Sequence, residues 1–78
     1  MSELLTYIIK NLTGTDEFSV TEESLEGTTT LQIKTDPSII RHIIGKEGRT
    51  IKNIRRIVAI KAALEGKTVN IEVSEAEG

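Results

Sequence analysis

Ile44-Gly45-Lys46-Glu47-Gly48-Arg49-Thr50-Ile51 is the stretch of this 78-residue chain that most constrains its fold. An apolar segment that opens at Pro37 leads into it, and a longer, partly basic segment that closes at Gly66 follows it. Proline favours the first turn of a helix and glycine the position just past its end, so the pattern predicts two helices joined by a four-residue turn. The turn exposes backbone N–H groups at the start of the second helix, which makes it a candidate anion site.

The remaining segments predict one more helix and three strands. Apolar residues at spacings of three and four over 3–13, followed by Gly14, predict an amphipathic helix. Alternating apolar and polar residues predict strands at 17–22, 28–35 and 67–73. We therefore expect an α+β, two-layer fold with three helices on one face of a three-stranded sheet. Residues 1–78 are expected to form a single domain, with 74–78 as a disordered tail.

Length and composition place the chain among small domains that fold by core packing alone. A domain of this size buries only about 60% of its unfolded surface. The chain has no cysteine and a single histidine, which excludes a disulfide framework, a thiolate nucleophile and a zinc site. Its first ten residues suit neither a signal peptide nor a membrane span. We expect a cytoplasmic protein with no cofactor, no metal, no membrane contact and no small-molecule substrate.

Charge is distributed unevenly along the chain. The net formal charge is -2, but residues 41–61 contain seven of the ten basic residues and one acidic residue, so this segment carries +6. Because salt screens exposed charges beyond roughly 10 Å, a local basic patch attracts anions even on an acidic protein. A solvated helix face would have the same composition, so charge alone does not decide the function.

The segment after Gly48 has two chemically different faces on a helical wheel. Basic residues occupy one side. The apolar side, which we expect to face the core, contains Ile51, Ile54, Ile57, Val58, Ala62 and Leu64. Ile60 falls among the basic residues, where it is either an ordinary exposed isoleucine or part of a self-association surface.

Two other interpretations of the glycine turn are less satisfactory. A Walker-type phosphate loop is excluded because no strand leads directly into the turn and Glu47 stands where Ser or Thr is required. A helix-turn-helix that binds duplex DNA has the right segment lengths, and Arg49, Lys52 and Arg56 could enter a major groove. A simple turn between two helices nevertheless does not require two glycines. The common helix-turn-helix domain also consists of three helices and lacks the strands that flank this segment.

Aromatic residues are too few for the stacking platforms of several RNA-binding folds. Tyr7 and Phe18 are the only two in the chain. RNA-recognition-motif sheets, cold-shock domains and oligonucleotide-binding barrels all hold bases on exposed aromatic rings. If the chain binds nucleic acid, it does so in another way.

The quoted stretch resembles the I-G-x-x-G-x-x-I signature of KH domains, between two helices where that family has it. The extra helix and strand before the strand-helix-helix-strand core resemble the type II, bacterial arrangement, and GKEGRTIKNIRRIV is similar to the small single-domain KhpA-type proteins. The resemblance implies a non-enzymatic protein that binds single-stranded RNA, as an RNA chaperone or post-transcriptional regulator. It implies a homodimer, or a larger KH-containing partner of the KhpB (Jag) type.

Glycines without β-carbons let a sugar-phosphate backbone approach the turn, and the helix dipole favours phosphate there. The resemblance implies an RNA-binding loop of Gly45, Lys46, Glu47, Gly48 and Arg49. It implies an adjacent groove made of Ile40, Ile43, Ile44 and Ile51 as floor, Leu31, Gln32, Ile33 and Lys34 as strand wall, and Lys52 and Arg55 beside it. Each of these isoleucines is equally explained as a core residue. An acid within the loop predicts weak binding by one domain.

A protein-interaction module on a KH scaffold is the main alternative function. In that case Ile60, Leu25 or a sheet edge would make the contacts, with little RNA binding. Single-stranded or duplex DNA binding is a further alternative. Catalysis is not expected, because no nucleophile stands with a base and no carboxylate pair has an evident purpose.

Overall fold

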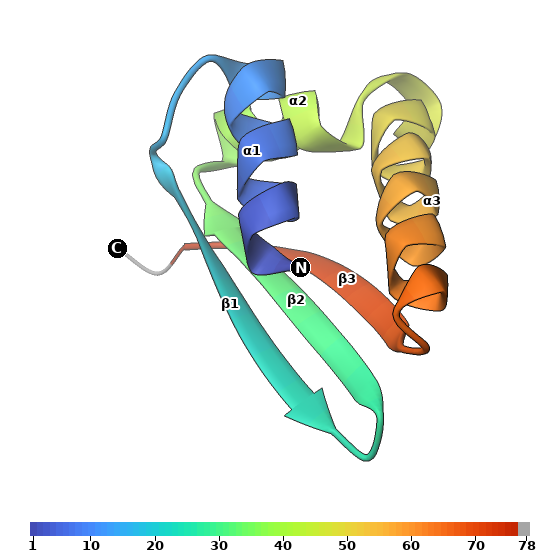
Figure 1. Ribbon diagram of the computed structural model, residues 1–78. Coiled ribbons are helices and arrows are strands. Elements are labelled where there is room, and N and C mark those ends of the chain that lie inside the picture. Colours follow the sequence, from blue (N-terminus) through green and yellow to red (C-terminus); the bar gives the residue numbers. More distant parts are fainter. Residues whose placement is uncertain (77–78) are drawn as a thin grey trace.

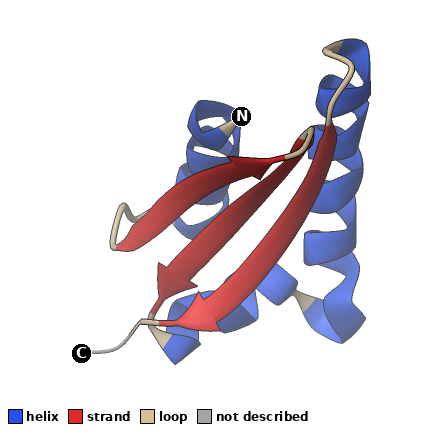
Figure 2. Ribbon diagram, turned by 90° about the horizontal axis from the view of Figure 1, so that it is seen from below, coloured by secondary structure: helices blue, strands red, loops and turns tan. Residues whose placement is uncertain are grey.

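Three helices cover one face of a three-stranded sheet, and the opposite face of the sheet is open (Figures 1 and 2). The structure is a computed structural model that describes residues 1–76. Its elements are α1 (Ser2–Thr13), β1 (Phe18–Leu25), β2 (Thr28–Thr35), α2 (Pro37–Ile44), a 3₁₀ turn (Lys46–Gly48), α3 (Arg49–Leu64) and β3 (Thr68–Glu75). The predicted α+β fold and its order of elements are confirmed. Within the described residues, no helix combines the length and the apolar character that a bilayer crossing requires.

The sheet is mixed, with β2 at its centre and β1 and β3 at its edges. β1 and β2 form an antiparallel hairpin, and β3 lies parallel to β2 with Leu31 opposite Ile71. A parallel neighbour needs a crossover connection, which α2 and α3 supply here. The crossover therefore brings the glycine turn and α3 to the β3 side of the sheet, as Figure 1 shows.

The core lies between the sheet and the helices. Strand alternation turns Leu31 and Ile33 of β2 toward the helices, where both are fully buried. They pack in one cluster with Leu5 and Ile9 of α1 and with residues of α2 and α3. Full burial of one such side chain contributes about 1.5–3 kcal/mol. Packing against β2 thus fixes how the helices, and the turn between two of them, sit on the sheet.

Three expectations about element bounds and burial were wrong in detail. β1 continues three residues beyond the predicted end because the chain reverses only at Glu26 and Gly27, whose φ values of 50° and 82° suit a tight hairpin turn. Residues 74 and 75 belong to β3 rather than to a disordered tail, since the strand continues beside β2, and the N–H of Ala76 donates to Thr35 O at 2.9 Å. Residues 77–78 lie outside the described part.

The apolar face of α3 is also narrower than the wheel predicted. Ile57 and Leu64 are 49% and 81% exposed, whereas the buried positions are Ile51, Ile54, Val58 and Ala62. α3 stands at one end of the helix layer, with the other helices on one side of it (Figure 1). The helix therefore buries a single stripe and leaves apolar residues beside it in solvent.

Candidate nucleic-acid interface

α2 begins and ends for reasons that are visible in its terminal residues. Asp36 caps it: the carboxylate accepts a hydrogen bond from the Ser38 N–H at 3.4 Å, and Pro37 occupies the first turn. The helix stops at Gly45, whose φ of 75° and ψ of 179° belong to a region that is essentially restricted to glycine. Gly45 therefore redirects the chain out of α2 and into the turn.

The turn itself is a single 3₁₀ turn held in a left-handed conformation. The N–H of Gly48 donates to the carbonyl of Gly45 at 3.2 Å. Glu47 and Gly48 have φ values of 56° and 73°, and regular α-helix resumes at Arg49. Two successive residues with positive φ turn the chain sharply, so that α3 leaves in a new direction (Figure 1).

The two glycines of the turn are required for different physical reasons. A β-carbon on Gly45 would overlap Oγ1 of Thr50 and lie 2.6 Å from its Cβ. A β-carbon on Gly48 would meet nothing within 4 Å, so at that position the positive φ and the open approach from solvent are what favour glycine. Thr50 was quoted in the motif but not singled out from the sequence, because its contact with Gly45 follows from the three-dimensional turn.

The start of α3 is exposed and basic. Within residues 1–76, no side chain caps the first N–H groups of α3, whose N-cap is Gly48. Lys46 and Arg49 flank this terminus, and both side chains are exposed. Arg49 Nη2 lies 3.7 Å from Glu47 Oε2, an exposed pair of the kind that contributes at most about 1 kcal/mol. The Arg49 N–H donates to the Lys46 carbonyl. A positive helix end without a side-chain cap and two exposed cations together form a candidate anion site.

The structure divides the predicted groove floor into core and surface residues. Ile43 and Ile51 are buried in the core, which leaves them inaccessible to a ligand. Ile40 is half-buried and Ile44 is 37% exposed, so these two can contact a molecule that lies beside the turn. Lys52 is exposed on α3. The available floor is thus smaller than the one that the sequence predicted.

The β2 residues that were predicted to form the wall of the groove do not face the turn. Leu31 and Ile33 are fully buried, and both edges of β2 are paired with neighbouring strands. Gln32 and Lys34 alternate with them and therefore point to the open face of the sheet, away from the helices. These four residues cannot form a groove with the turn, because the strand that borders α3 is β3.

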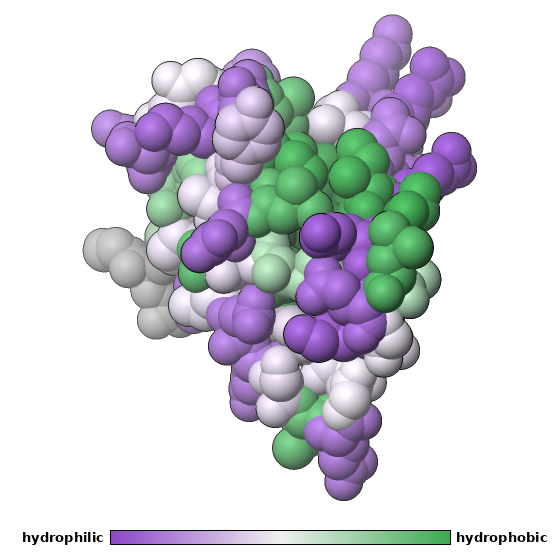
Figure 3. Space-filling view, in the orientation of Figure 1, coloured by the Kyte–Doolittle hydropathy of each residue, from purple (hydrophilic) through white to green (hydrophobic). Residues whose placement is uncertain are grey.

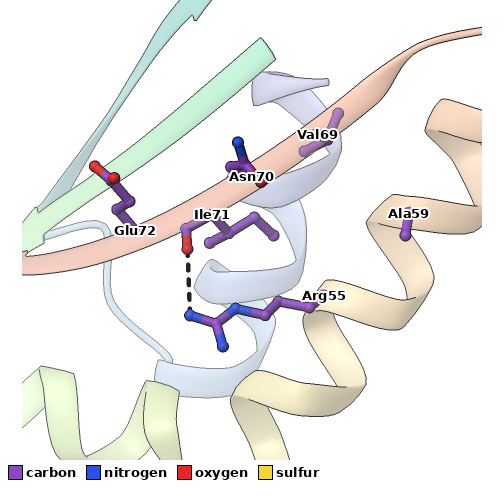
Figure 4. A pocket seen from close by; sticks show the side chains of 6 residues that line it. All are labelled: Arg55, Ala59, Val69, Asn70, Ile71 and Glu72. Carbon is purple, nitrogen blue, oxygen red and sulfur yellow. Dashed lines mark hydrogen bonds between the residues drawn. The ribbon is translucent and has the colours of Figure 1, made fainter. Parts of the chain in front are cut away.

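A groove of about 400 Å³ lies between α3 and β3 (Figure 4). Its lining residues are Arg55 and Ala59 of α3 with Val69, Asn70, Ile71 and Glu72 of β3. Arg55 Nη2 donates to the carbonyl oxygen of Ile71 at 3.3 Å, across the open edge of the strand. Arg55 was predicted from the sequence to border the groove, whereas its strand partner was missed because strand order depends on tertiary packing.

A metal site and a functional role for His42 have no support among the described residues. No group of three or more His, Cys, Asp and Glu side chains is arranged to hold a metal ion in residues 1–76. His42 is exposed on α2 and has no hydrogen bond from its ring to another described residue. The arrangement at the turn can hold an anion, and the groove beside it can accept a flat or extended ligand.

Comparison with known proteins agrees with this geometry. The family model for the KH domain of KhpA and KhpB matches residues 2–73. The chain is 39% identical to the RNA-binding protein KhpA of Chlamydia trachomatis over 77 residues, which cover 96% of this chain and 97% of that protein. It is 36% identical to the RNA-binding protein KhpA of Clostridium acetobutylicum over 74 residues, covering 94% and 99% of the two chains.

A solved structure extends the comparison to the fold. The crystal structure of Era from Aquifex aeolicus, bound to GDP and AlF4-, superposes with a TM-score of 0.70 at 18% identity. The match covers 95% of this chain and 29% of that one. At this identity the likeness concerns the arrangement of helices and strands, and it places the present chain against one part of a larger protein.

Proposed function

Because the chain belongs to the KhpA/KhpB family of KH domains, we propose that it binds single-stranded RNA through the Gly45–Gly48 turn and the groove beside it. The uncapped, basic start of α3 is the observation that carries the proposal. The protein acts without catalysis, as expected of a family of non-enzymatic binding domains, and works in the cytoplasm as an RNA chaperone or post-transcriptional regulator.

Phosphate is held at the turn in this proposal, and bases lie in the groove. A backbone phosphate approaches Gly48, where no β-carbon keeps it away, and accepts from N–H groups of the first turn of α3 beyond Arg49, whose own N–H donates to the Lys46 carbonyl. Lys46 and Arg49 add charge, while Ile44 offers apolar contact next to the turn. This part of the contact holds any sequence, because phosphate groups are the same at every nucleotide.

The strand side of the proposed groove is β3. Ile71 lies at the open edge of the sheet, opposite Arg55, and Ala59 leaves space between helix and strand. Proteins that recognise single-stranded RNA commonly bind unstacked bases in such a groove, rather than a duplex. The contacts proposed here are thus the turn, part of α2, one face of α3 and the edge of β3.

Self-association is part of the proposed function, because α3 carries an exposed apolar stripe. Ile57, Ile60 and Leu64 are 49%, 59% and 81% exposed at spacings of three and four. Figure 3 shows apolar surface along α3 and between α3 and α1, in the orientation of Figure 1. A homodimer would bury this stripe and place two weak RNA sites on one particle, which raises the apparent affinity through effective concentration. A larger KhpB-type protein is the alternative partner for the same stripe.

The same stripe supports the second candidate function, a protein-interaction module with little RNA binding. Leu25, at the end of β1, is also exposed and provides a further apolar contact point. Sedimentation at several concentrations separates the possibilities. We expect a concentration-dependent dimer that Ile60→Asp converts to a monomer, and a parent that stays monomeric throughout would contradict self-association.

The test of RNA binding compares the parent with Lys46→Asp plus Glu47→Asp by fluorescence anisotropy on a pool of short unstructured RNA. We expect affinity to fall about fivefold to twentyfold, because a cation near the phosphate becomes an anion. Lys67→Asp is the matched control: it makes the same charge change about 25 Å away, near the other end of α3, and should have little effect.

Unchanged affinity in the double variant, with its fold verified by circular dichroism, would contradict the role of the turn. The same titration with single-stranded and duplex DNA of the same sequences tests the DNA alternatives. Equal binding of RNA and single-stranded DNA would mean that the 2′-hydroxyl is not read.

A further inference from the structure

β1 forms one free edge of the sheet. Within residues 1–76 it is hydrogen-bonded to β2 alone, and Figure 1 shows it at the margin of the sheet. Natural edge strands are protected against further pairing by shortness, by a proline, by a bulge or by charged residues. β1 has eight residues and no proline, and its register with β2 is unbroken from Phe18 opposite Thr35 to Leu25 opposite Thr28. Charge is therefore the one of these protections that this edge has.

The hairpin turn identifies the backbone groups of β1 that face outward. Glu26 and Gly27 both have positive φ and form a two-residue turn. The pair that closes such a turn, Leu25 and Thr28, exchanges both of its hydrogen bonds, and the pairing then alternates along an antiparallel ladder. Every second residue of β1 consequently turns its N–H and C=O away from β2. These residues are Phe18, Val20, Glu22 and Ser24.

The segment that contains this edge is acidic. Residues 14–27 include five acidic residues and no lysine or arginine. Glu22 and Glu23 are neighbours in β1, both are exposed, and strand alternation turns them to opposite faces of the sheet. The Glu22 carboxylate accepts a hydrogen bond from the Ser2 N–H at 3.2 Å, whereas Glu23 has no salt bridge within the described residues. A strand that lies beside β1 thus has an acid next to it on either face.

The opposite edge of the sheet has the opposite charge beside it. β3 borders α3, and Arg55 Nη2 donates to the Ile71 carbonyl at 3.3 Å. A basic segment is repelled there and attracted to β1. Pairing of β1 with β1 of a second copy would bring Glu22 and Glu23 of both chains together, which like-charge repulsion disfavours. The charges therefore select a partner that is neither acidic nor another copy of this edge.

We propose that the outer edge of β1 binds an extended, lysine- or arginine-rich segment of another protein by strand addition. In this mode main-chain hydrogen bonds provide affinity and side chains at alternate positions provide specificity. Two successive basic residues fit best, because one lies opposite Glu22 on the helix side and the next lies opposite Glu23 on the open face. Val20 is half-buried on the same face as Glu22 and favours an apolar residue opposite it. This inference goes beyond RNA binding and does not depend on it.

The test uses a fluorescein-labelled peptide of about ten residues, long enough to span β1, in which two central lysines are flanked by alternating valine and threonine. By fluorescence anisotropy at low salt, we expect it to bind at least about tenfold more tightly than the same peptide with glutamate in place of lysine. Methylation of its central backbone nitrogens keeps the charges but removes the N–H donors. The methylated peptide should bind at least about fivefold more weakly than the unmethylated one.

A charge reversal on β1 tests the acidic residues. Glu23→Lys should weaken binding of the lysine peptide about fivefold, because a cross-strand attraction becomes a repulsion. Glu65→Lys is the matched control: it makes the same charge change at an exposed residue on the β3 side of the sheet, and it should change affinity less than about twofold. Both residues are exposed, so the variants should fold, which circular dichroism verifies.

Amide hydrogen exchange, followed by NMR, identifies the edge that the peptide uses. Bound peptide should slow exchange at the N–H groups of Val20, Glu22 and Ser24, which face outward. Exchange at Thr21 and Glu23 should not change, because their N–H groups bond to β2 in the free protein. Protection along β3 instead, equal binding of the methylated and unmethylated peptides, or no binding of the lysine peptide would each overturn the inference. The RNA affinity of the protein is a separate measurement, so none of these results bears on the proposed function.

Discussion

The two helices that meet at the glycine turn begin in opposite ways. α2 starts from Asp36, whose carboxylate accepts the Ser38 N–H, with Pro37 in the first turn. α3 starts from Gly48, and no side chain of residues 1–76 caps it. A side-chain cap satisfies the free N–H groups of a helix from within the chain. The first helix start thus has a side-chain cap, whereas the second has only the hydrogen bond from the Arg49 N–H to the Lys46 carbonyl and is where we propose that an anion binds.

The charges near the two helix starts also differ, because the start of α2 has an acid and the start of α3 has two cations. Asp36 is an acid at the positive end of α2, where it stabilises the helix. Lys46 and Arg49 are cations at the positive end of α3, where they are unfavourable for the helix and favourable for a phosphate. A local arrangement that costs stability, next to one that provides it, supports the proposal that the start of α3 binds an anion.

Gly45→Ala should have the largest effect on this difference. The substitution places a β-carbon against Thr50 and puts alanine at φ 75° and ψ 179°, so we expect a loss of at least about 2 kcal/mol of stability, together with RNA binding. Gly14→Ala is the control, because its φ is also positive, at 71°, but its β-carbon meets nothing within 4 Å. That change should cost about 1 kcal/mol and leave RNA affinity unaltered. Equal costs in urea unfolding would mean that the Thr50 contact is not restrictive.

Asp36→Ala should have an intermediate effect, and on stability alone. Loss of an N-cap typically costs about 0.5–2 kcal/mol, and the 3.4 Å bond places this cap in the lower part of that range. The affinity of the folded protein for RNA should not change, since the start of α2 takes no part in binding. Chemical denaturation and anisotropy on the same sample measure both quantities. A matching fall in RNA affinity would mean that the start of α2 also takes part in binding, which would contradict the distinction between the two helix starts.

Glu47→Gln should have the smallest effect, and in opposite directions on two properties. Removal of a carboxylate near the bound phosphate, which also releases Arg49, should raise RNA affinity about twofold to fivefold. Loss of an acid near the start of α3 should lower stability by a few tenths of a kcal/mol. Glu65→Gln, near the other end of α3, provides the comparison. Weaker RNA binding by Glu47→Gln would show that the carboxylate assists the ligand instead of opposing it.

The fold could be predicted because the residues that begin and end its helices act through local backbone preferences. Pro37, Gly45 and Gly48 mark helix boundaries through their own φ preferences, and strand alternation identifies the side that faces the core. The end of β1 was predicted three residues too early because Glu26, a non-glycine residue with positive φ, gives little sequence signal of where the turn lies. Local sequence patterns therefore predicted which elements form, but they predicted the end of each element less accurately.

The candidate site was predictable only where it is continuous in sequence. The turn and Arg55 were named from the sequence, and Arg55 does line a groove, but Leu31 and Ile33 were assigned to a groove wall and are core residues. Strand order decides which strand borders α3, and it follows from the packing of the crossover rather than from any one segment. The contact of Thr50 with Gly45, and of Arg55 with Ile71, likewise appears only when distant or twisted segments come together.

Backbone amide chemical shifts, followed by NMR during titration with a short single-stranded RNA, test the central claim most directly. If the start of α3 holds phosphate, the largest shifts should occur at the N–H groups of residues 46–50, with smaller ones near Ile71. The N–H of Ser38, bound to its cap, should scarcely move. Shifts confined to the exposed stripe of Ile57, Ile60 and Leu64, with none at residues 46–50, would contradict the account.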